Sequence, residues 1–254
     1  MILDKVTITG ADDSVDPEEL IPLARDFPFV EWGILFSKRS VGVPRYPSES
    51  WTARLCRVTN QVPMRLSAHL CGAWVRDFVL DAKLTFRDKY RGQIYMAFDR
   101  LQLNFHAHHH AASERFKLEL DTIPKEGALG NNGKGKQVIF QMDGVNDQLW
   151  DSVWKSGSNH VPLFDRSGGA GVLPKSWPAP YAGVYCGYAG GLGPDNLTDQ
   201  LALIDMAAPG PHRVWVDMET KVRSDDDSRL DLDRVRACLE AAAPFVTKEA
   251  GGRR

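Results

Sequence analysis

Short runs of apolar and β-branched residues recur along the chain, and several are apolar nearly throughout instead of alternating with polar residues. Such runs are typical of strands covered on both faces, as in a parallel sheet. Segments with helical patterning separate most of them. The eight predicted strands are Val6–Thr9, Phe29–Phe36, Leu66–Cys71, Arg100–Phe105, Gln137–Met142, His160–Phe164, Ala182–Tyr188 and Arg213–Val216.

Helix start signals fall between these strands. Asp16-Pro17-Glu18-Glu19 places a capping residue, a first-turn proline and two acids at one start. Further starts follow at Ser48 and at Pro194-Asp195-Asn196, and Asn146–Trp154 predicts a short helix. The clearest helix is Leu230–Phe245, whose apolar residues share one stripe.

Eight strands alternating with helices in 254 residues fit the size of a (β/α)8 barrel. We therefore predict an α/β fold, a single-domain TIM barrel over residues 1–247, with an insertion around 106–136 and a flexible tail at 248–254. An open doubly wound sheet would use similar elements. The barrel differs because it requires Val6–Thr9 to pair with Arg213–Val216.

The composition is that of a soluble globular protein, with 43% hydrophobic and 25% charged residues. A formal net charge of -2 gives no general field for a polyanion, and no interleaved basic and aromatic pattern suggests a nucleic-acid partner. No apolar run is long enough for a membrane span. The start of the chain lacks a signal-peptide pattern, and the four cysteines form no C-x-x-C pair, so we expect a cytoplasmic protein with reduced thiols.

The strongest chemical signal is the glycine-rich stretch Gly187–Asn196, which follows the seventh predicted strand and ends at a helix start. Gly190 and Gly191 would let the backbone approach an anion, and free amides at the next helix start could hold a phosphate. A tight turn without a ligand would use the same residues. The place after strand seven favours the anion site, because barrels often bind phosphate there.

Asp165 directly follows the sixth predicted strand and precedes Gly168 and Gly169. A carboxylate at this end of a barrel strand can act as a general acid or base. It could equally cap a turn or pair with Arg166. Arg45 lies in the loop after strand two, where it could grip a carboxylate or phosphate if it points inward, or remain on a solvated surface loop.

These segments together resemble the phosphoribosylanthranilate isomerase family. The resemblance rests on Trp32–Phe36 with Pro44–Ser48, on Leu163–Asp165 with Gly168–Gly171, and on Ala189–Asn196, and a looser echo is Val216–Val222. It implies that Asp165 is the general acid of an Amadori rearrangement and that Arg45 holds the substrate carboxylate. It also implies that Gly168, Gly169, Gly190, Gly191 and the amides near Thr220 contact the phosphorylated substrate.

The first strand departs from this family. Where the family carries its general-base cysteine, this chain has Thr9, whose hydroxyl is too weak an acid to take over proton abstraction. Loss of that base leaves three functions open: an isomerase with an unidentified base, an enzyme of the lyase or aldolase type on the same phosphate-binding barrel, and a non-catalytic phosphometabolite-binding protein. Replacement bases open to consideration are Asp12, Asp13, Cys71, Asp143, Cys186 and Asp217.

Histidines cluster at His106 and His108–His110. Consecutive histidines on a loop cannot all converge on one ion, and no H-E-x-x-H motif accompanies them, so we predict neither a metal nor another cofactor. His69, on strand three, is expected to be a packed and hydrogen-bonded core residue, with a substrate contact as the alternative. The expected partner is a small phosphorylated substrate, and the protein is expected to be a monomer or a homodimer.

Overall fold

Eight parallel strands close into a barrel in strand order β1 to β8. The computed structural model describes residues 1–75, 92, 94, 96–104, 136–144, 146, 147, 150 and 159–246. The fold is therefore the predicted (β/α)8 barrel. Its strands are β1 (Ile2–Thr9), β2 (Val30–Phe36), β3 (Arg65–Cys71), β4 (Arg100–Asn104), β5 (Gln137–Met142), β6 (His160–Phe164), β7 (Cys186–Ala189) and β8 (Arg213–Met218).

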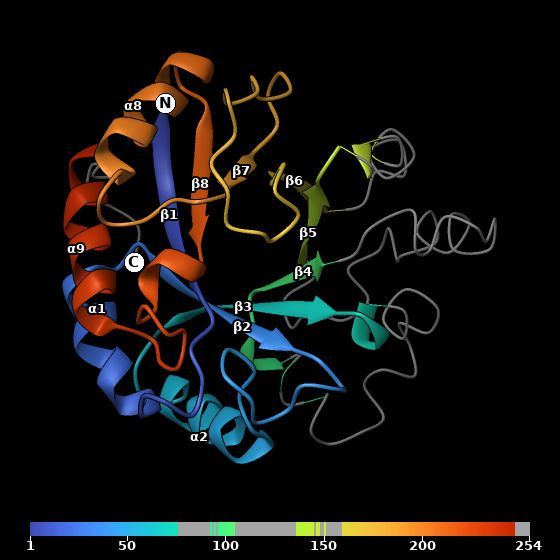
Figure 1. The fold of residues 1–254 in the computed structure, drawn as a ribbon, viewed down its shortest axis with the longest axis vertical. Helices are drawn as coiled ribbons and strands as arrows, with labels where there is room; N and C mark the ends of the chain where they lie inside the picture. The colour runs from blue at the N-terminus through green and yellow to red at the C-terminus, as the bar shows by residue number, and fades with distance from the viewer. Residues whose placement is uncertain are drawn as a thin grey trace.

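The barrel closes where the first strand meets the last. Val6 pairs with Val216 and Thr7 with Asp217, in the parallel register that the barrel requires and an open doubly wound sheet would not show. Figure 1 shows β1 and β8 running side by side. Every strand thus has two neighbours, so the barrel has no exposed sheet edge.

Helices on the outside follow the start signals of the sequence. They are η1 (Pro17–Glu19), α1 (Leu20–Asp26), α2 (Glu49–Thr59), α8 (Leu197–Ala207), η2 (Thr220–Val222), α9 (Leu232–Ala242) and η3 (Ala243–Phe245). Ser48 caps α2 by accepting a bond from the amide of Trp51 at 3.2 Å. Asp231 caps α9 in the same way. In Figure 1, α1, α8 and α9 lie along one side of the barrel.

Several predicted boundaries shift. The seventh strand begins at Cys186 and not at Ala182, because the preceding residues turn back, with the amide of Val184 donating to the carbonyl of Tyr181 at 3.0 Å. The helix predicted from Asp16 begins as a 3-10 turn before α1. Four predicted features lie wholly or largely outside the described residues. They are the helix Asn146–Trp154, the His106–His110 cluster, the insertion at 106–136 and the tail at 248–254. No helix in the described part of the chain has the length and apolarity needed to cross a bilayer.

Charged groups occupy the barrel interior near the amino-terminal ends of the strands, where apolar side chains usually pack. Arg100 on β4 donates from Nε to Glu31 Oε2 at 2.9 Å, and the hydroxyl of Thr7 donates to Glu31 Oε1 at 2.9 Å. All three side chains are buried. The guanidinium of Arg100 also lies 4.5 Å from the ring centroid of Trp215, which packs inside the barrel.

The Arg100–Glu31 pair gives a stability prediction. Arg100→Leu should lower the free energy of unfolding by roughly 3–5 kcal/mol, because it leaves the buried Glu31 carboxylate without its cation. The double variant Arg100→Leu/Glu31→Leu should recover much of that loss. Urea unfolding of the single and double variants measures both effects, and a double variant no more stable than the single one would show that the charge is not the cause.

Candidate functional site

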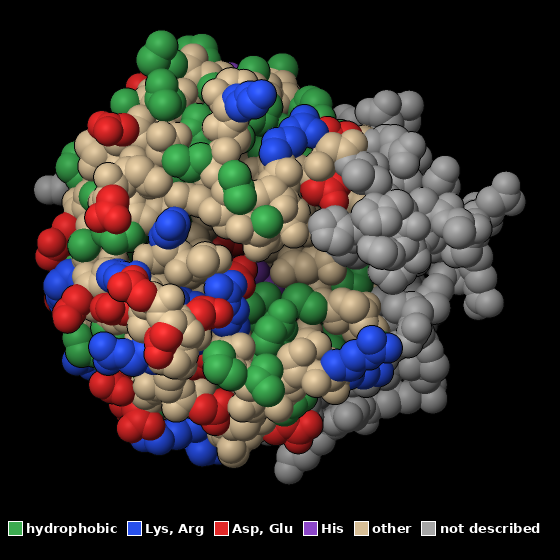
Figure 2. Space-filling view, in the orientation of Figure 1, with side chains coloured by type: hydrophobic (Ala, Val, Ile, Leu, Met, Phe, Trp, Pro, Cys, Tyr) green, Lys and Arg blue, Asp and Glu red, His purple; other side chains and the backbone are tan. Residues whose placement is uncertain are grey.

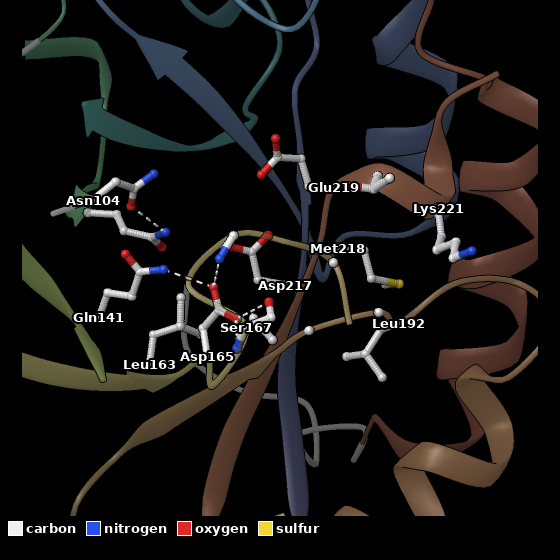
Figure 3. Close-up of a pocket in the computed structure, with 17 residues that line it drawn as sticks. Asn104, Gln141, Leu163, Asp165, Ser167, Leu192, Asp217, Met218, Glu219 and Lys221 are labelled. Carbon is white, nitrogen blue, oxygen red and sulfur yellow. Dashed lines mark hydrogen bonds between the residues drawn. The ribbon is translucent and has the colours of Figure 1, made fainter. Parts of the chain in front are cut away.

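A cavity of about 60 Å³ lies at the carboxyl ends of strands β4 to β8, which is where (β/α)8 enzymes carry their active sites. Five of the eight predicted site residues line it, namely Asp165, Gly169, Gly190, Gly191 and Thr220. Figure 3 shows two of its three acidic side chains, Asp165 and Asp217, close to each other near the centre. The lining residues used below are Gln102, Asn104, Gln141, Asp165, Ser167, Gly169, Gly190, Gly191, Asp217, Glu219, Thr220 and Lys221.

Asp165 is held in place by four donors. Its Oδ1 accepts bonds from the amide of Ser167 at 3.1 Å and from the Ser167 hydroxyl at 2.7 Å. Its Oδ2 accepts from Gln141 Nε2 at 2.8 Å and from the amide of Gly169 at 2.8 Å. A carboxylate that only accepts bonds matches the hydrogen-bonding pattern of an ionised acid. The turn-capping interpretation of Asp165 is thus correct for its backbone bonds, while Arg166 pairs instead with Asp147.

Asp217 has a very different environment. It lies inside β8, is buried, and receives one side-chain hydrogen bond, from the hydroxyl of Thr9 at 2.7 Å. Burial raises the pKa of Asp217 to about 8, and the Thr9 bond lowers it only in part. The nearby carboxylates of Glu219, Asp165 and Glu31 also contribute to this raised pKa. Asp217 is therefore protonated at neutral pH, and the two carboxyl groups of the cavity differ in the way that acid–base pairs do.

Thr9 does not line the cavity. Its side chain is 1% exposed, and its one role in the site is to orient Asp217. The position of the family's cysteine base is thus filled by a residue that contacts a carboxyl group. Asp217 was only one of several candidate bases in the sequence, because a lone aspartate within a strand does not reveal what it packs against.

Arg45 is bound by acids of the β8 loop and is not among the residues that line the cavity. Its Nε donates to Asp227 Oδ2 at 2.7 Å, and its Nη1 to Glu219 Oε1 at 2.6 Å. Its backbone has a positive φ of 74°. Burial raises the pKa of Glu219, although Arg45 opposes this shift. Arg45 points inward, as a functional role requires, but here it fastens the β2 loop to the β8 loop.

The predicted phosphate loop follows β7 and forms one wall of the cavity. A Cβ atom at Gly190 would lie 2.9 Å from the carbonyl oxygen of Val172, and one at Gly191 would lie 2.7 Å from the amide nitrogen of Leu173. Both glycines have positive φ angles. They are therefore required by close backbone approach, because the loop after β6 lies directly across them.

Backbone amides from two loops also line this side of the cavity. Within the described residues, the amides of Gly191, Leu192, Thr220 and Lys221 donate no hydrogen bond. They come from the loops after β7 and β8, the usual place for a phosphate in this fold. Lys221 also lines the cavity, although Figure 3 shows its side chain directed away from the two aspartates. Gly168 forms part of the turn under Asp165 and does not line the cavity.

The other candidate bases have structural partners. Asp12 accepts a bond from Arg223 at 2.9 Å, and Asp13 accepts one from the amide of Ser48 at 2.7 Å. Asp143 accepts a bond from the amide of Asn146, and burial raises the pKa of the thiols of Cys71 and Cys186 to about 12. None of these five residues lines the cavity.

A larger hollow of about 860 Å³ lies at the opposite end of the barrel, around the buried Arg100–Glu31 pair. Three of its other charged residues form ion pairs, with Lys5 and Arg213 both bound to Asp4. We place the candidate site at the smaller cavity because chemistry in this fold is carried at the carboxyl ends of the strands. Figure 2 shows a hollow near the centre of the visible face, with acidic and histidine surface at its bottom.

Among the described residues, no three acidic, histidine or cysteine side chains are placed to share a metal ion. The chain matches no known protein-family model, and no curated protein matches it. Fold and site together define a (β/α)8-barrel protein with a protonated and an acceptor-only carboxyl group beside a glycine-walled pocket.

The raised pKa of Asp217 predicts how stability depends on pH. Between its ordinary value of 3.8 and about 8, the folded protein holds a proton that the unfolded chain releases. Stability from this group is thus fully present below pH 3.8 and is lost as the pH rises towards 8. Asp217→Asn, which can still accept the Thr9 bond, should be more stable than the wild type at pH 8 by on the order of a few kcal/mol.

Thermal and urea unfolding from pH 5 to pH 9 measures this difference. The matched control is Asp199→Asn on the exposed face of α8, which should change stability by less than about 0.5 kcal/mol at any pH. A constant gap between Asp217→Asn and wild type across the range would contradict the raised pKa.

Proposed function

We propose that this protein is an aldose–ketose isomerase acting on a small phosphorylated sugar derivative, in which Asp217 is the general acid and Asp165 the general base. The observation that carries the proposal is the pair of unlike carboxyl groups in one cavity beside a glycine-walled anion site. Isomerisation of this kind needs one group that takes a proton from carbon while another gives a proton to oxygen. The family resemblance implies instead that Asp165 is the general acid.

The chemistry balances without a co-reactant. The Asp165 carboxylate removes the proton from the carbon next to the aldehyde or ring-opened imine, and the electrons of that bond form a carbon–carbon double bond. Asp217 donates its proton to the oxygen or nitrogen of the former double bond. Transfer of the first proton from Asp165 to the terminal carbon, with release of the proton of the hydroxyl group on carbon two to Asp217, completes the shift from aldose to ketose.

The order of the strands is consistent with these acid and base roles. β7 lies between β6, which Asp165 directly follows, and β8, which contains Asp217. A phosphate held by the amides of Gly191 and Leu192 would therefore lie at the wall between the two acids. Such anchoring of a remote group fixes the reacting carbon in place.

Two observations favour isomerisation over the alternatives. A Schiff-base lyase needs a lysine aimed at the substrate, and Lys221, the one lysine among the described cavity residues, is directed away from the aspartates. A protein that only binds a phosphate has no need of Asp217, whose buried, protonated carboxyl group lowers stability at neutral pH relative to a neutral side chain. Arg45 is assigned a positioning role on the loops after β2 and β8.

Phosphate binding is tested first, with inorganic phosphate as the probe. Gly191→Ala should weaken phosphate binding at least tenfold, because the new methyl group would push Leu173 and the wall out of place. The matched control is Gly183→Ala, which has a similar φ of 72° but no atom within 4 Å of its Cβ, so it carries the same backbone strain. Titration calorimetry measures the phosphate affinity of both variants, and equal affinities would show that phosphate does not bind at this loop.

Catalysis is tested with a panel of aldose phosphates and with phosphoribosylanthranilate in deuterated water. Isomerisation replaces the hydrogen on carbon two by deuterium or moves it, and proton NMR detects either change. Asp165→Asn and Asp217→Asn should each reduce the rate by about 10²–10⁴-fold. Asp143→Asn, a carboxylate at the end of β5 that does not line the cavity, should keep full activity. Undiminished exchange in either cavity variant contradicts the assigned roles.

A further inference from the structure

One side of the cavity is built from amide side chains. Gln102 and Asn104 on β4 and Gln141 on β5 line it, and Figure 3 shows Asn104 and Gln141 across the cavity from Glu219 and Lys221. This wall thus faces the loops after β7 and β8 that we assign to phosphate. A ligand anchored there would place its remaining groups against the amides.

The amide nitrogens of all three side chains already have hydrogen-bond acceptors. Gln141 Nε2 donates to Asp165, Gln102 Nε2 donates to Asn104 Oδ1 at 2.9 Å, and Asn104 Nδ2 donates to Cys71 Sγ at 3.6 Å. Gln102 Oε1 is buried and accepts no bond, although the residue is only 4% exposed. A buried polar atom left without a partner costs about 1–3 kcal/mol. Such an exception to the general satisfaction of buried groups calls for a function.

A second unpaired atom lies beside it. His69 on β3 is directly opposite Gln102 in the strand register, and its Nε2 is buried without a partner. The expected hydrogen-bonded core histidine is thus unsatisfied at this nitrogen. A Cβ at Gly33 would lie 3.0 Å from His69 Nε2 and 2.2 Å from the Thr9 hydroxyl, so the imidazole reaches the centre of the barrel close to the acid site.

The chemistry of the two atoms selects the ligand group. An amide oxygen needs a donor, which excludes a carbonyl or an ionised carboxylate. Burial lowers the pKa of His69 to about 3, so its ring is neutral and can either donate or accept. A hydroxyl group, which donates one bond and accepts others, can satisfy an amide oxygen and a neutral imidazole together.

We infer that Gln102 is a specificity-determining residue whose Oε1 accepts a hydrogen bond from a hydroxyl group of a sugar phosphate, with His69 beside it. The inference rests on the proposed function, because it takes the phosphate anchor from there. It goes further in making a free hydroxyl group, and not only the phosphate, a condition for binding. A site built to bond a hydroxyl group rejects analogues that lack it far more strongly than an apolar pocket does.

The test compares three probes by titration calorimetry: inorganic phosphate, ethyl phosphate, which has no hydroxyl group on carbon, and ribose 5-phosphate. Wild type should bind ribose 5-phosphate at least about tenfold more tightly than ethyl phosphate. Gln102→Met, which keeps the length of the side chain, should lose that preference and leave the affinity for ethyl phosphate unchanged. Gln137→Met, the same change at the other end of the barrel on β5, should keep it.

Stability supplies an independent measurement. Gln102→Met removes the unpaired buried oxygen but also the Nε2 bond to Asn104, so the two effects offset each other and the unliganded variant should melt close to the wild-type temperature. A glutamine with a merely structural role would instead leave the variant less stable. Gln102→Leu serves as the second variant, should the methionine fold poorly.

The outcomes separate the two proposals. If none of the three probes binds wild type, the proposed function fails and the sugar phosphate class fails with it. If phosphate and ethyl phosphate bind but ribose 5-phosphate binds no more tightly, the inference alone is overturned. Retention of the preference in Gln102→Met, or a marked fall in its melting temperature, also overturns the inference.

Discussion

The pairing of β1 with β8 is the constraint on which the site depends. It joins residues more than 200 positions apart and brings the hydroxyl of Thr9 to the carboxyl of Asp217. Without closure, Asp217 would lie at a sheet edge in contact with water, and the burial that raises its pKa would be absent. The acid of the proposed mechanism is therefore a product of the closed topology and not of local sequence.

The same closure explains why the two carboxyl groups differ. Asp165 stands in a loop, where backbone amides of the following turn can reach it, while Asp217 stands within a strand, whose amides are used by its neighbours. Both aspartates are buried, but Asp165 accepts four hydrogen bonds and Asp217 accepts one side-chain bond. Their hydrogen-bonding environments differ because one lies just beyond the end of a strand and the other lies within it.

Much of the fold could be read from the chain, since long apolar runs and helix caps report locally on burial. Strands β5 and β6 have the predicted bounds, whereas β7 was predicted to begin too early, at Ala182, because Val184 adds apolar signal to a turn that precedes the strand. Asp165, Gly190 and Gly191 were found from their positions at strand ends. The partners of Arg45, and the unpaired atoms of Gln102 and His69, arise from contacts across the barrel, which no spacing in the sequence encodes.

The segment that crosses Gly190 and Gly191 has a chemical consequence. With Val172 and Leu173 in contact with the glycine wall, the loop after β6 covers one side of the cavity. A lift of this loop would widen the site for a substrate, and its return would shut out water. Where the phosphate is on the carbon next to the enediol, as in a triose phosphate, the intermediate readily expels its phosphate group in free solution. A closed wall around that group would suppress this elimination, so the loop would protect the product as well as admit the substrate.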